Sequence, residues 1–246
     1  MTAPPVFVEA QGLQKRFGAF HAVQGVSFRC YAGEVFGLLG PNGAGKTTTL
    51  RMLTTILRPT AGTARIAGHD VVDDPEAVRR VIGVLPENAG IYGRLTAREV
   101  VRYAGRLHGV HPEVLEGRLE AMFEKLEMSA HVDRLTDTFS RGMKQKVSIA
   151  RALVHDPPVV FLDEPTSGLD VISARSVREF VQRFKQDGRC VIMSTHLMEE
   201  AERLCDRVAI IARGRVQAEG RLEELKARTG RGLEEIFVQL VEDNIR

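Results

Sequence analysis

Residues 40–47, with the sequence Gly-Pro-Asn-Gly-Ala-Gly-Lys-Thr, are of the types that bind phosphate groups. They fit the pattern Gly-x4-Gly-Lys-[Ser/Thr], whose glycines let successive backbone N–H groups turn toward an anion. Lys46 supplies a positive charge for the outer phosphates, and Thr47 supplies a hydroxyl for Mg2+. We therefore predict a site for a nucleoside triphosphate with magnesium. The predicted nucleotide-binding residues of this stretch are Gly40, Pro41, Asn42, Gly43, Ala44, Gly45, Lys46, Thr47 and Thr48.

The residues on either side of this stretch indicate the setting that the motif needs. Residues 34–39 are typical of a buried strand, and Leu50, Leu53 and Leu57 recur at helical spacing within residues 48–57. A helix that starts there points its positive end at the phosphates. A glycine-rich turn ahead of an ordinary helix is the alternative, but the strand–loop–helix order argues against it.

A second group of chemically active residues follows the apolar run at residues 159–162. A strand ending there would carry Asp163 to the edge of the sheet where α/β folds bind ligands, and there Asp163 could hold Mg2+. Glu164 comes next and could polarise a water for attack on the γ-phosphate. Alternatively, Asp163 caps a helix and Glu164 is a solvated charge. Downstream of a phosphate loop, the pair favours hydrolysis over binding alone.

The elements expected to position these residues alternate between strand and helix, as in an α/β domain. Short strands are predicted at residues 6–9 and 22–29. Unbroken apolar runs at residues 159–162, 190–193 and 208–211 suit the central strands of a parallel sheet.

Residues 88–156 lack strand signals and predict helices instead. Thr96 and Glu99 fit a capping box at the start of one helix, and residues 113–126 and 143–153 predict two more. We interpret this block as a helical subdomain inserted into the α/β core. The predicted divisions are residues 1–87 for an antiparallel β part and the first half of the core, 88–157 for the helical subdomain, 158–220 for the second half of the core, and 221–246 for a helical tail.

The whole chain has 246 residues, enough for one or two domains with a sizeable core, and a net charge of +2. Its Lys and Arg residues are scattered, so no nucleic-acid partner is expected. Cys30, Cys190 and Cys205 show neither metal-ligand spacing nor a paired framework, which fits a reducing cytosol. The chain start lacks the features of a signal peptide, and no apolar run approaches the ~18 residues that span a bilayer. A membrane role would therefore need another polypeptide.

With these motifs in place, the chain resembles the nucleotide-binding subunits of ABC transporters along nearly its whole length. Residues 139–145, Phe-Ser-Arg-Gly-Met-Lys-Gln, stand where the family has its signature Leu-Ser-Gly-Gly-Gln. Residues 167–170, Ser-Gly-Leu-Asp, resemble the D-loop, and residues 194–196, Ser-Thr-His, resemble the switch-histidine motif. Phe17 matches the aromatic residue that stacks on adenine, although it could instead belong to the core. The resemblance implies an α/β P-loop NTPase fold, with a RecA-like parallel-sheet core, an N-terminal antiparallel β part and an inserted helical subdomain.

The resemblance also implies a role for several residues that have a plainer structural reading. Ser140 is a good helix N-cap, and with Gly142 it would contact the ATP held by a second subunit. Asp170 would join the same nucleotide-binding set. His196, which could instead be a surface histidine, would contact the γ-phosphate and orient Glu164. The predicted catalytic residues are thus Glu164, His196 and Lys46.

Two positions depart from the family pattern. Glu87 stands where the family usually has glutamine. The side-chain oxygen of that glutamine coordinates Mg2+ and responds to the membrane subunit. We expect Glu87 to remain a metal ligand, with altered nucleotide affinity or coupling. Arg141 replaces the first glycine of the signature and could reach the triphosphate bidentately or face solvent. The predicted metal ligands are Thr47, Glu87 and Asp163.

These variants resemble the branch of the family that partners ABC-2-type permeases and includes sodium-efflux and some drug-efflux ATPases. The resemblance implies an ATPase that forms a homodimer or heterodimer around two Mg-ATP and drives a separate integral membrane permease from the cytoplasmic face. Ile91, Tyr92 and Leu95 would form an apolar patch that contacts the permease. Alternatively, they would pack beneath the helix that begins at Thr96. A non-transport ATPase acting on DNA or the ribosome is the alternative. Such relatives usually carry two cassettes or long coiled coils, and this chain shows neither.

Overall fold

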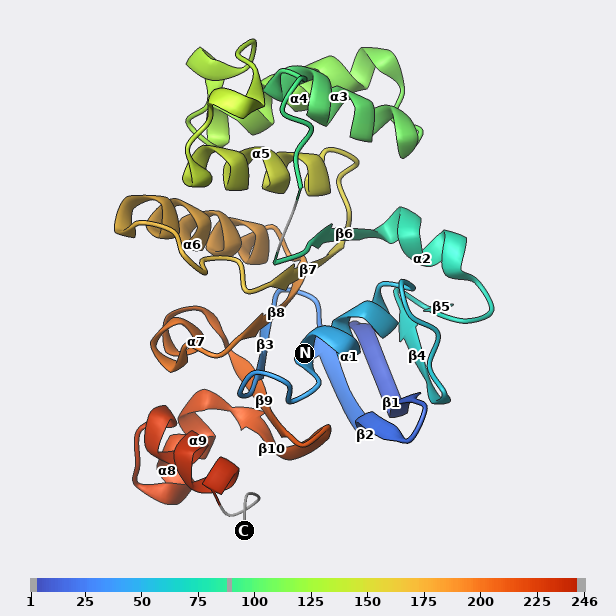
Figure 1. Ribbon diagram of the computed structural model, residues 1–246, viewed down its shortest axis with the longest axis vertical. Helices are drawn as coiled ribbons and strands as arrows, with labels where there is room; N and C mark the ends of the chain where they lie inside the picture. The colour runs from blue at the N-terminus through green and yellow to red at the C-terminus, as the bar shows by residue number, and fades with distance from the viewer. Residues whose placement is uncertain (1–3, 88–89, 243–246) are drawn as a thin grey trace.

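The computed structural model describes residues 4–87 and 90–242, which form three groups of elements in Figure 1. A β-rich part lies beside a larger sheet, helices flank that sheet, and a cluster of helices covers one end of the molecule. The predicted α/β class is confirmed by this arrangement of strands and helices. No helix among the described residues has the length and apolar character needed to cross a membrane.

The larger sheet has six strands in the order β10-β9-β3-β8-β7-β6. Neighbouring strands pair in parallel, except that β10 pairs antiparallel with β9. Every residue of β3, β7 and β8 is buried, which explains why their sequences are mostly unbroken apolar runs instead of alternating. The strands are β3 (Val35–Leu39), β6 (Ile82–Leu85), β7 (Val159–Asp163), β8 (Cys190–Thr195), β9 (Arg207–Ala212) and β10 (Arg215–Arg221).

The six-stranded sheet separates two hydrophobic cores, because successive residues of a strand point to opposite faces. Val35 and Leu39 belong to one core, and Phe36 and Leu38 belong to the other. The first core continues into the helical part of the molecule. The second core is shared with α1 and with a four-stranded antiparallel sheet of order β2-β1-β4-β5. These elements are α1 (Lys46–Leu53), β1 (Val6–Phe17), β2 (Phe20–Tyr31), β4 (Ala61–Ile66) and β5 (His69–Asp70), and α2 (Pro75–Val81) leads into β6.

The helical part forms where the sequence predicts it, with a hydrogen-bonded cap at the start of two of its helices. Thr96 Oγ1 accepts a hydrogen bond of 3.2 Å from Glu99 N, and the Glu99 carboxylate accepts one of 2.8 Å from Thr96 N, so the capping box is confirmed. Ser140 Oγ accepts a bond of 3.2 Å from Met143 N, which starts the third helix at Arg141 instead of Met143. The elements are α3 (Ala97–Leu107), α4 (Pro112–Lys125), the 3-10 turns η1 (Ser129–His131) and η2 (Thr136–Thr138), and α5 (Arg141–Leu153).

The helix after the phosphate motif is shorter than the predicted residues 48–57 and begins earlier. Gly45, with φ 105°, is its N-cap, so Lys46 is already helical. The helix ends at Leu53 because Thr55 adopts a left-handed conformation with φ 63°. Leu57 lies beyond the helix but still packs against the second core.

The remaining elements complete the order that the sequence predicts. They are α6 (Val171–Gln186), α7 (Met198–Leu204), α8 (Leu222–Thr229) and α9 (Leu233–Glu242). Helix α9 contacts α7 and β9, so the tail packs against the core. All three cysteines are buried and free. The four predicted divisions of the chain stay a prediction, and of their residues 1–3, 88–89 and 243–246 lie outside the described part.

Candidate active site

The loop between β3 and α1 needs its glycines for conformation and for space. Gly43 and Gly45 have φ values of 79° and 105°, in the left-handed region that side chains disfavour. A Cβ on Gly45 would lie 2.6 Å from Ala22 O, and a Cβ on Gly40 would collide with Ile211 O. The loop is therefore closely held by the strands around it, as an anion-binding nest requires.

Lys46 lies within this loop with only 6% of its surface exposed. Its Nζ donates hydrogen bonds to Gly40 O at 2.7 Å and Pro41 O at 3.3 Å, and lies 3.7 Å from Glu164 Oε1. Burial lowers the pKa of Lys46, and the carboxylates of Glu164 and Asp163 oppose that shift. The loop carbonyls thus hold a desolvated cation next to the nest.

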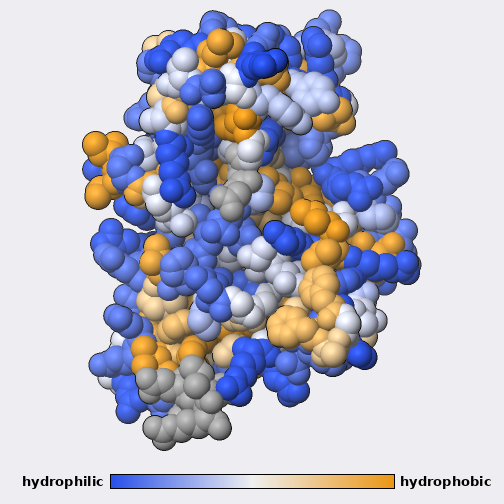
Figure 2. Space-filling view, in the orientation of Figure 1, coloured by the Kyte–Doolittle hydropathy of each residue, from blue (hydrophilic) through white to orange (hydrophobic). Residues whose placement is uncertain are grey.

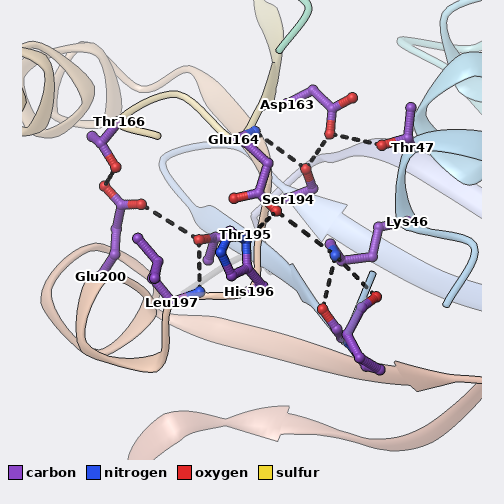
Figure 3. A network of polar contacts seen from close by, with 12 residues as sticks. Lys46, Thr47, Asp163, Glu164, Thr166, Ser194, Thr195, His196, Leu197 and Glu200 are labelled. Carbon is purple, nitrogen blue, oxygen red and sulfur yellow. Dashed lines mark hydrogen bonds and ion pairs between the residues drawn. The ribbon is translucent and has the colours of Figure 1, made fainter. Parts of the chain in front are cut away.

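The side chains of Thr47 and Asp163 meet from α1 and β7. Thr47 Oγ1 donates a hydrogen bond of 3.1 Å to Asp163 Oδ1, and Ser194 Oγ donates to the same oxygen. Asp163 pairs in register with Ser194 on β8, so the sheet fixes the carboxylate (Figure 3). A hydroxyl and a carboxylate are hard oxygen donors of the kind Mg2+ prefers, and they leave its other positions to water and phosphate oxygens.

Glu164 and His196 form a pair at the ends of β7 and β8. Glu164 Oε1 lies 2.9 Å from His196 Nδ1, and Glu164 N donates a bond of 3.1 Å to Ser194 O. Glu164 has φ 49°, which is unusual for a residue with a side chain. Its other oxygen, Oε2, is buried and has no hydrogen-bond partner among the described residues. An acceptor without a partner at a sheet edge is available to bond a water or a ligand.

These side chains border a cleft of about 590 Å³, a size in the usual range for small-molecule sites. Phe17 and Phe20 form its aromatic side and are 49% and 64% exposed. The predicted residues that line the cleft are Phe17, Asn42, Gly43, Ala44, Gly45, Lys46, Thr47, Thr48, Glu87, Glu164 and His196. Gly40, Pro41 and Asp163 do not line the cleft, but they contact residues that do. Asp163 accepts a hydrogen bond from Thr47, and the Pro41 carbonyl accepts one from Lys46.

Three predicted nucleotide-binding residues lie together at the starts of α5 and α6 and do not line this cleft. Asp170 caps α6, with its Oδ1 accepting hydrogen bonds from Ile172 N and Ser173 N at 3.0 and 2.9 Å. A Cβ on Gly142 would collide with Ser173 Oγ, so the two helix starts are in close contact. Ser140 caps α5 beside them. Within one subunit, this signature cluster of Ser140, Gly142 and Asp170 is separate from the phosphate loop.

Arg141, for which two orientations were predicted, stays exposed but has a definite partner. Its Nη2 donates a hydrogen bond of 2.8 Å to Ser167 O, and its guanidinium lies directly against Gly168. Gln145 of the same helix donates a bond of 2.7 Å to Pro165 O. The first turns of α5 therefore hold the segment that follows Glu164.

The residues after Glu87 divide between packing and exposure. Ile91 and Leu95 are partly buried against the first core, as the packing alternative predicts. Tyr92 is 68% exposed, as the alternative of an apolar patch requires. Glu87 itself is exposed at the rim of the cleft, where its carboxylate can face a ligand.

Phe20, a member of the cleft, was missed by the sequence analysis. Phe17 and Phe20 pair across the two-residue connection between β1 and β2. That pairing was the available signal, because a hairpin that places one aromatic side chain also places its cross-strand partner.

Together, the phosphate loop after β3 and the carboxylates that end β7 lie on either side of β8. This arrangement defines a nucleoside-triphosphate-binding protein of the α/β class. The family model described as "ABC transporter" matches residues 23–167. The chain therefore belongs to the ABC transporter family, as an ATP-binding cassette with ATPase activity.

The relatives agree with this assignment. The chain is 44% identical over 205 residues to the ABC transporter ATP-binding protein NatA of Bacillus subtilis, covering 83% of each protein. It is 42% identical over 229 residues to the daunorubicin/doxorubicin resistance ATP-binding protein DrrA of Streptomyces peucetius, covering 93% of this chain and 69% of DrrA. A solved ATP-binding subunit of an ABC transporter superposes with a TM-score of 0.88 at 33% identity, covering 95% of this chain and 99% of that one. The predicted cassette fold is confirmed.

Proposed function

We propose that the cleft hydrolyses Mg-ATP, with Glu164 as the general base, and that hydrolysis drives export through a separate membrane permease. The observation that carries the proposal is the Glu164 carboxylate. One of its oxygens lies beside Lys46 and His196, and the other is buried with no hydrogen-bond partner in the described part of the chain. That second oxygen is suited to accept a proton from a water aimed at the γ-phosphate.

Each neighbouring side chain has a distinct task in this proposal. The nest of residues 40–45 and Lys46 bind the phosphates, for which Lys46 exchanges its bonds to the loop carbonyls. Thr47, Asp163 and Glu87 would hold Mg2+, which neutralises charge on the phosphate oxygens when bound. His196 holds Glu164 Oε1 in place through Nδ1, and its other ring nitrogen is left to contact the γ-phosphate. Phe17 and Phe20 stack on the base.

The signature cluster supports a dimer as the working unit. Ser140, Gly142 and Asp170 lie at the starts of α5 and α6 and do not line the cleft beside their own phosphate loop, so we expect them to contact a nucleotide held by a second subunit. Val171 and Ile172, which follow Asp170, are 82% and 79% exposed, an unusual position for adjacent apolar side chains. We infer that two cassettes, identical or different, face each other through this region and enclose two Mg-ATP.

The names of the relatives support export as the direction of transport. Besides NatA and the daunorubicin/doxorubicin resistance protein, they include a Nod factor export ATP-binding protein of Burkholderia lata, at 40% identity over 88% of this chain and 71% of that protein. Sodium or drug efflux through an ABC-2-type permease is the proposed activity. A DNA- or ribosome-directed ATPase finds no support among these relatives.

A docking surface for the permease is proposed beside the cleft, which would place the cassette on the cytoplasmic face of the membrane. Ile56, which is 63% exposed, lines a small pocket of about 120 Å³ together with Glu87, and Tyr92, which is 68% exposed, follows Glu87 in the chain. Figure 2 shows a band of apolar side chains over the region where β6 and α1 lie in Figure 1. Contact next to Glu87 would connect the permease to the metal site.

The test is recovery of the partner in a trapped state. Tagged Glu164→Gln with Mg-ATP is used to capture proteins from detergent-solubilised membranes of the source cell, and the proteins are identified by mass spectrometry. The variant Ile56→Asp/Tyr92→Asp in the same background is the matched control for the docking surface. We expect a multi-span permease with the first protein and little of it with the second. Ribosomal or DNA-repair proteins without a permease would contradict the transport proposal.

A further inference from the structure

Glu200 is a buried carboxylate outside the cleft that contacts two segments of the active site at once. It lies on α7 and is only 6% exposed. Its Oε1 accepts a hydrogen bond from Thr166 Oγ1, and its Oε2 accepts one of 3.4 Å from Thr195 Oγ1 (Figure 3). A carboxylate is costly to bury unless its oxygens are bonded, so these two contacts account for its presence there.

Both contacted threonines adjoin the residues proposed for hydrolysis. Thr166 lies two residues after Glu164, and Thr195 directly precedes His196. Thr195 Oγ1 also accepts a bond of 3.1 Å from Leu197 N, which closes the turn around His196. Glu200 therefore holds the side chains of Thr166 and Thr195, which lie close in the chain to Glu164 and His196.

These contacts complete a closed ring. On one side, His196 Nδ1 lies 2.9 Å from Glu164 Oε1. On the other side, Glu200 joins Thr166 to Thr195. Since the chain itself links Glu164 to Thr166 and Thr195 to His196, a shift at Glu200 can be transmitted to the contact between the imidazole and the carboxylate.

The environment of Glu200 suits a fixed, satisfied group. Burial raises the pKa of Glu200, while the bonds from Thr166 and Thr195 and the charge of Arg178 oppose that rise. Thr195 is fully buried and Thr166 nearly so, so water does not compete for these bonds. Glu200 does not line the cleft, and it therefore acts through other residues instead of touching ATP.

We propose that Glu200 is a positioning residue for ATP hydrolysis: by holding Thr166 and Thr195, it sets His196 against the Glu164 carboxylate. The inference rests on the proposed roles of Glu164 and His196. It predicts that Glu200 affects the rate of the chemical step and has little effect on ATP binding, since its hydrogen bonds go to Thr166 and Thr195 and not to the phosphate loop.

The first experiment compares two glutamates that are neighbours on the same helix. Glu200→Ala is expected to lower kcat at least 10-fold, with the KM for ATP changed less than about 3-fold, because an interaction that positions the chemical step is lost. Glu199→Ala is the matched control, since Glu199 is exposed and, among the described residues, its ion pair is with Arg203 on its own helix. Glu200→Gln should restore most of kcat, because its amide can accept from Thr166 and donate to Thr195.

A second readout separates positioning from general support of the fold. The side-chain NMR signal of His196, assigned by its absence in His196→Ala, should move in Glu200→Ala and return in Glu200→Gln. The signals of His108 and His155, on the helical part, should stay in place. Thr166→Val, which keeps the shape of the side chain and removes the donor, should reproduce the loss if Glu200→Ala fails to fold.

The outcomes separate this inference from the proposed function. A kcat for Glu200→Ala within twofold of Glu199→Ala would overturn the inference, and so would a lower kcat with an unmoved His196 signal. Turnover by Glu164→Gln at the normal rate would overturn the role of Glu164 whatever Glu200→Ala does. An inactive Glu164→Gln with a fully active Glu200→Ala would contradict the inference alone.

Discussion

At the scale of single residues, Glu164 is central to the proposed mechanism, and its position is unusual in both backbone and side chain. Its φ of 49° costs a residue with a side chain about 1–3 kcal/mol, and such conformations concentrate at functional sites. The bond from Glu164 N to Ser194 O helps to hold that conformation. As a result one oxygen faces Lys46 and His196, while the other is left for a water.

The aromatic side of the cleft gives a prediction at the same scale. Phe20→Ala should weaken ATP binding about 5-fold, because a stacked aromatic contributes on the order of 1 kcal/mol. Binding of inorganic triphosphate, which has no base to stack, should be unchanged. Calorimetric titration with both ligands measures the difference, and Tyr103→Ala, another exposed aromatic, is the control. Equal losses for the two ligands would argue against stacking.

At the scale of elements, two histidines connect the end of α3 to the end of α5. The rings of His108 and His155 are stacked, with centroids 3.7 Å apart, and His155 Nε2 lies 2.9 Å from Ile82 O on β6. Burial, with the nearby His108 as a smaller contribution, lowers the pKa of His155 to about 4. The fold thus favours neutral His155 as the link between the helical part and the sheet.

The sign of the resulting pH dependence follows from that lowered pKa. The unfolded value is about 6.5, so the stability contributed by neutral His155 is complete above pH 6.5 and is lost as pH falls toward 4. The loss should reach about 2 kcal/mol, allowing for the part of the ring that solvent reaches. Urea denaturation at pH 7.5 and pH 4.5 measures it. His155→Phe, which keeps a ring but cannot titrate, should lose less stability than the parent chain over that interval; an equal loss would contradict the assignment.

The contact between α5 and the segment after Glu164 gives a second element-scale prediction. Arg141→Ala should lower kcat about 3- to 10-fold, because the hydrogen bond to Ser167 O that holds the segment after Glu164 is lost. Gly168→Ala should act similarly, since its Cβ would displace the guanidinium and the left-handed φ of 66° disfavours alanine. The double variant should be no slower than the slower single one, in contrast to multiplied losses from independent sites. Arg175→Ala, which removes an exposed pair on α6, is the control for both.

Much of this arrangement was predictable because its signals are local. The phosphate loop, the capping box at Thr96 and the buried strands at β3, β7 and β8 follow from short runs of sequence. The end of α1 at Leu53 could not be predicted from such a run, because it depends on the left-handed turn at Thr55. Arg141 and Glu200 could not be placed either, since Arg141 bonds to Ser167 and Glu200 bonds to Thr166, and both partners are distant in the chain.

At the scale of the whole molecule, the proposed dimer depends on surfaces that one subunit leaves exposed. Val171→Asp should abolish the ATP-dependent dimer of Glu164→Gln, because Val171 is 82% exposed beside the signature cluster and burying a carboxylate there is costly. Light scattering after size exclusion, with and without Mg-ATP, measures the change in mass. Leu107→Asp, at an exposed apolar position on the helical part, should leave the dimer intact. A dimer that survives Val171→Asp would place the interface elsewhere.

The most direct test of the account is whether Glu164 supplies the chemistry and not the binding. Glu164→Gln keeps the size of the side chain and removes the base, so turnover of Mg-ATP should fall at least 100-fold while the dissociation constant for ATP changes less than about 3-fold. Glu223→Gln, an exposed glutamate on α8, should retain full turnover. Single-turnover hydrolysis and equilibrium binding, measured on the same preparations, decide the question. Near-normal hydrolysis by Glu164→Gln would contradict the proposed mechanism.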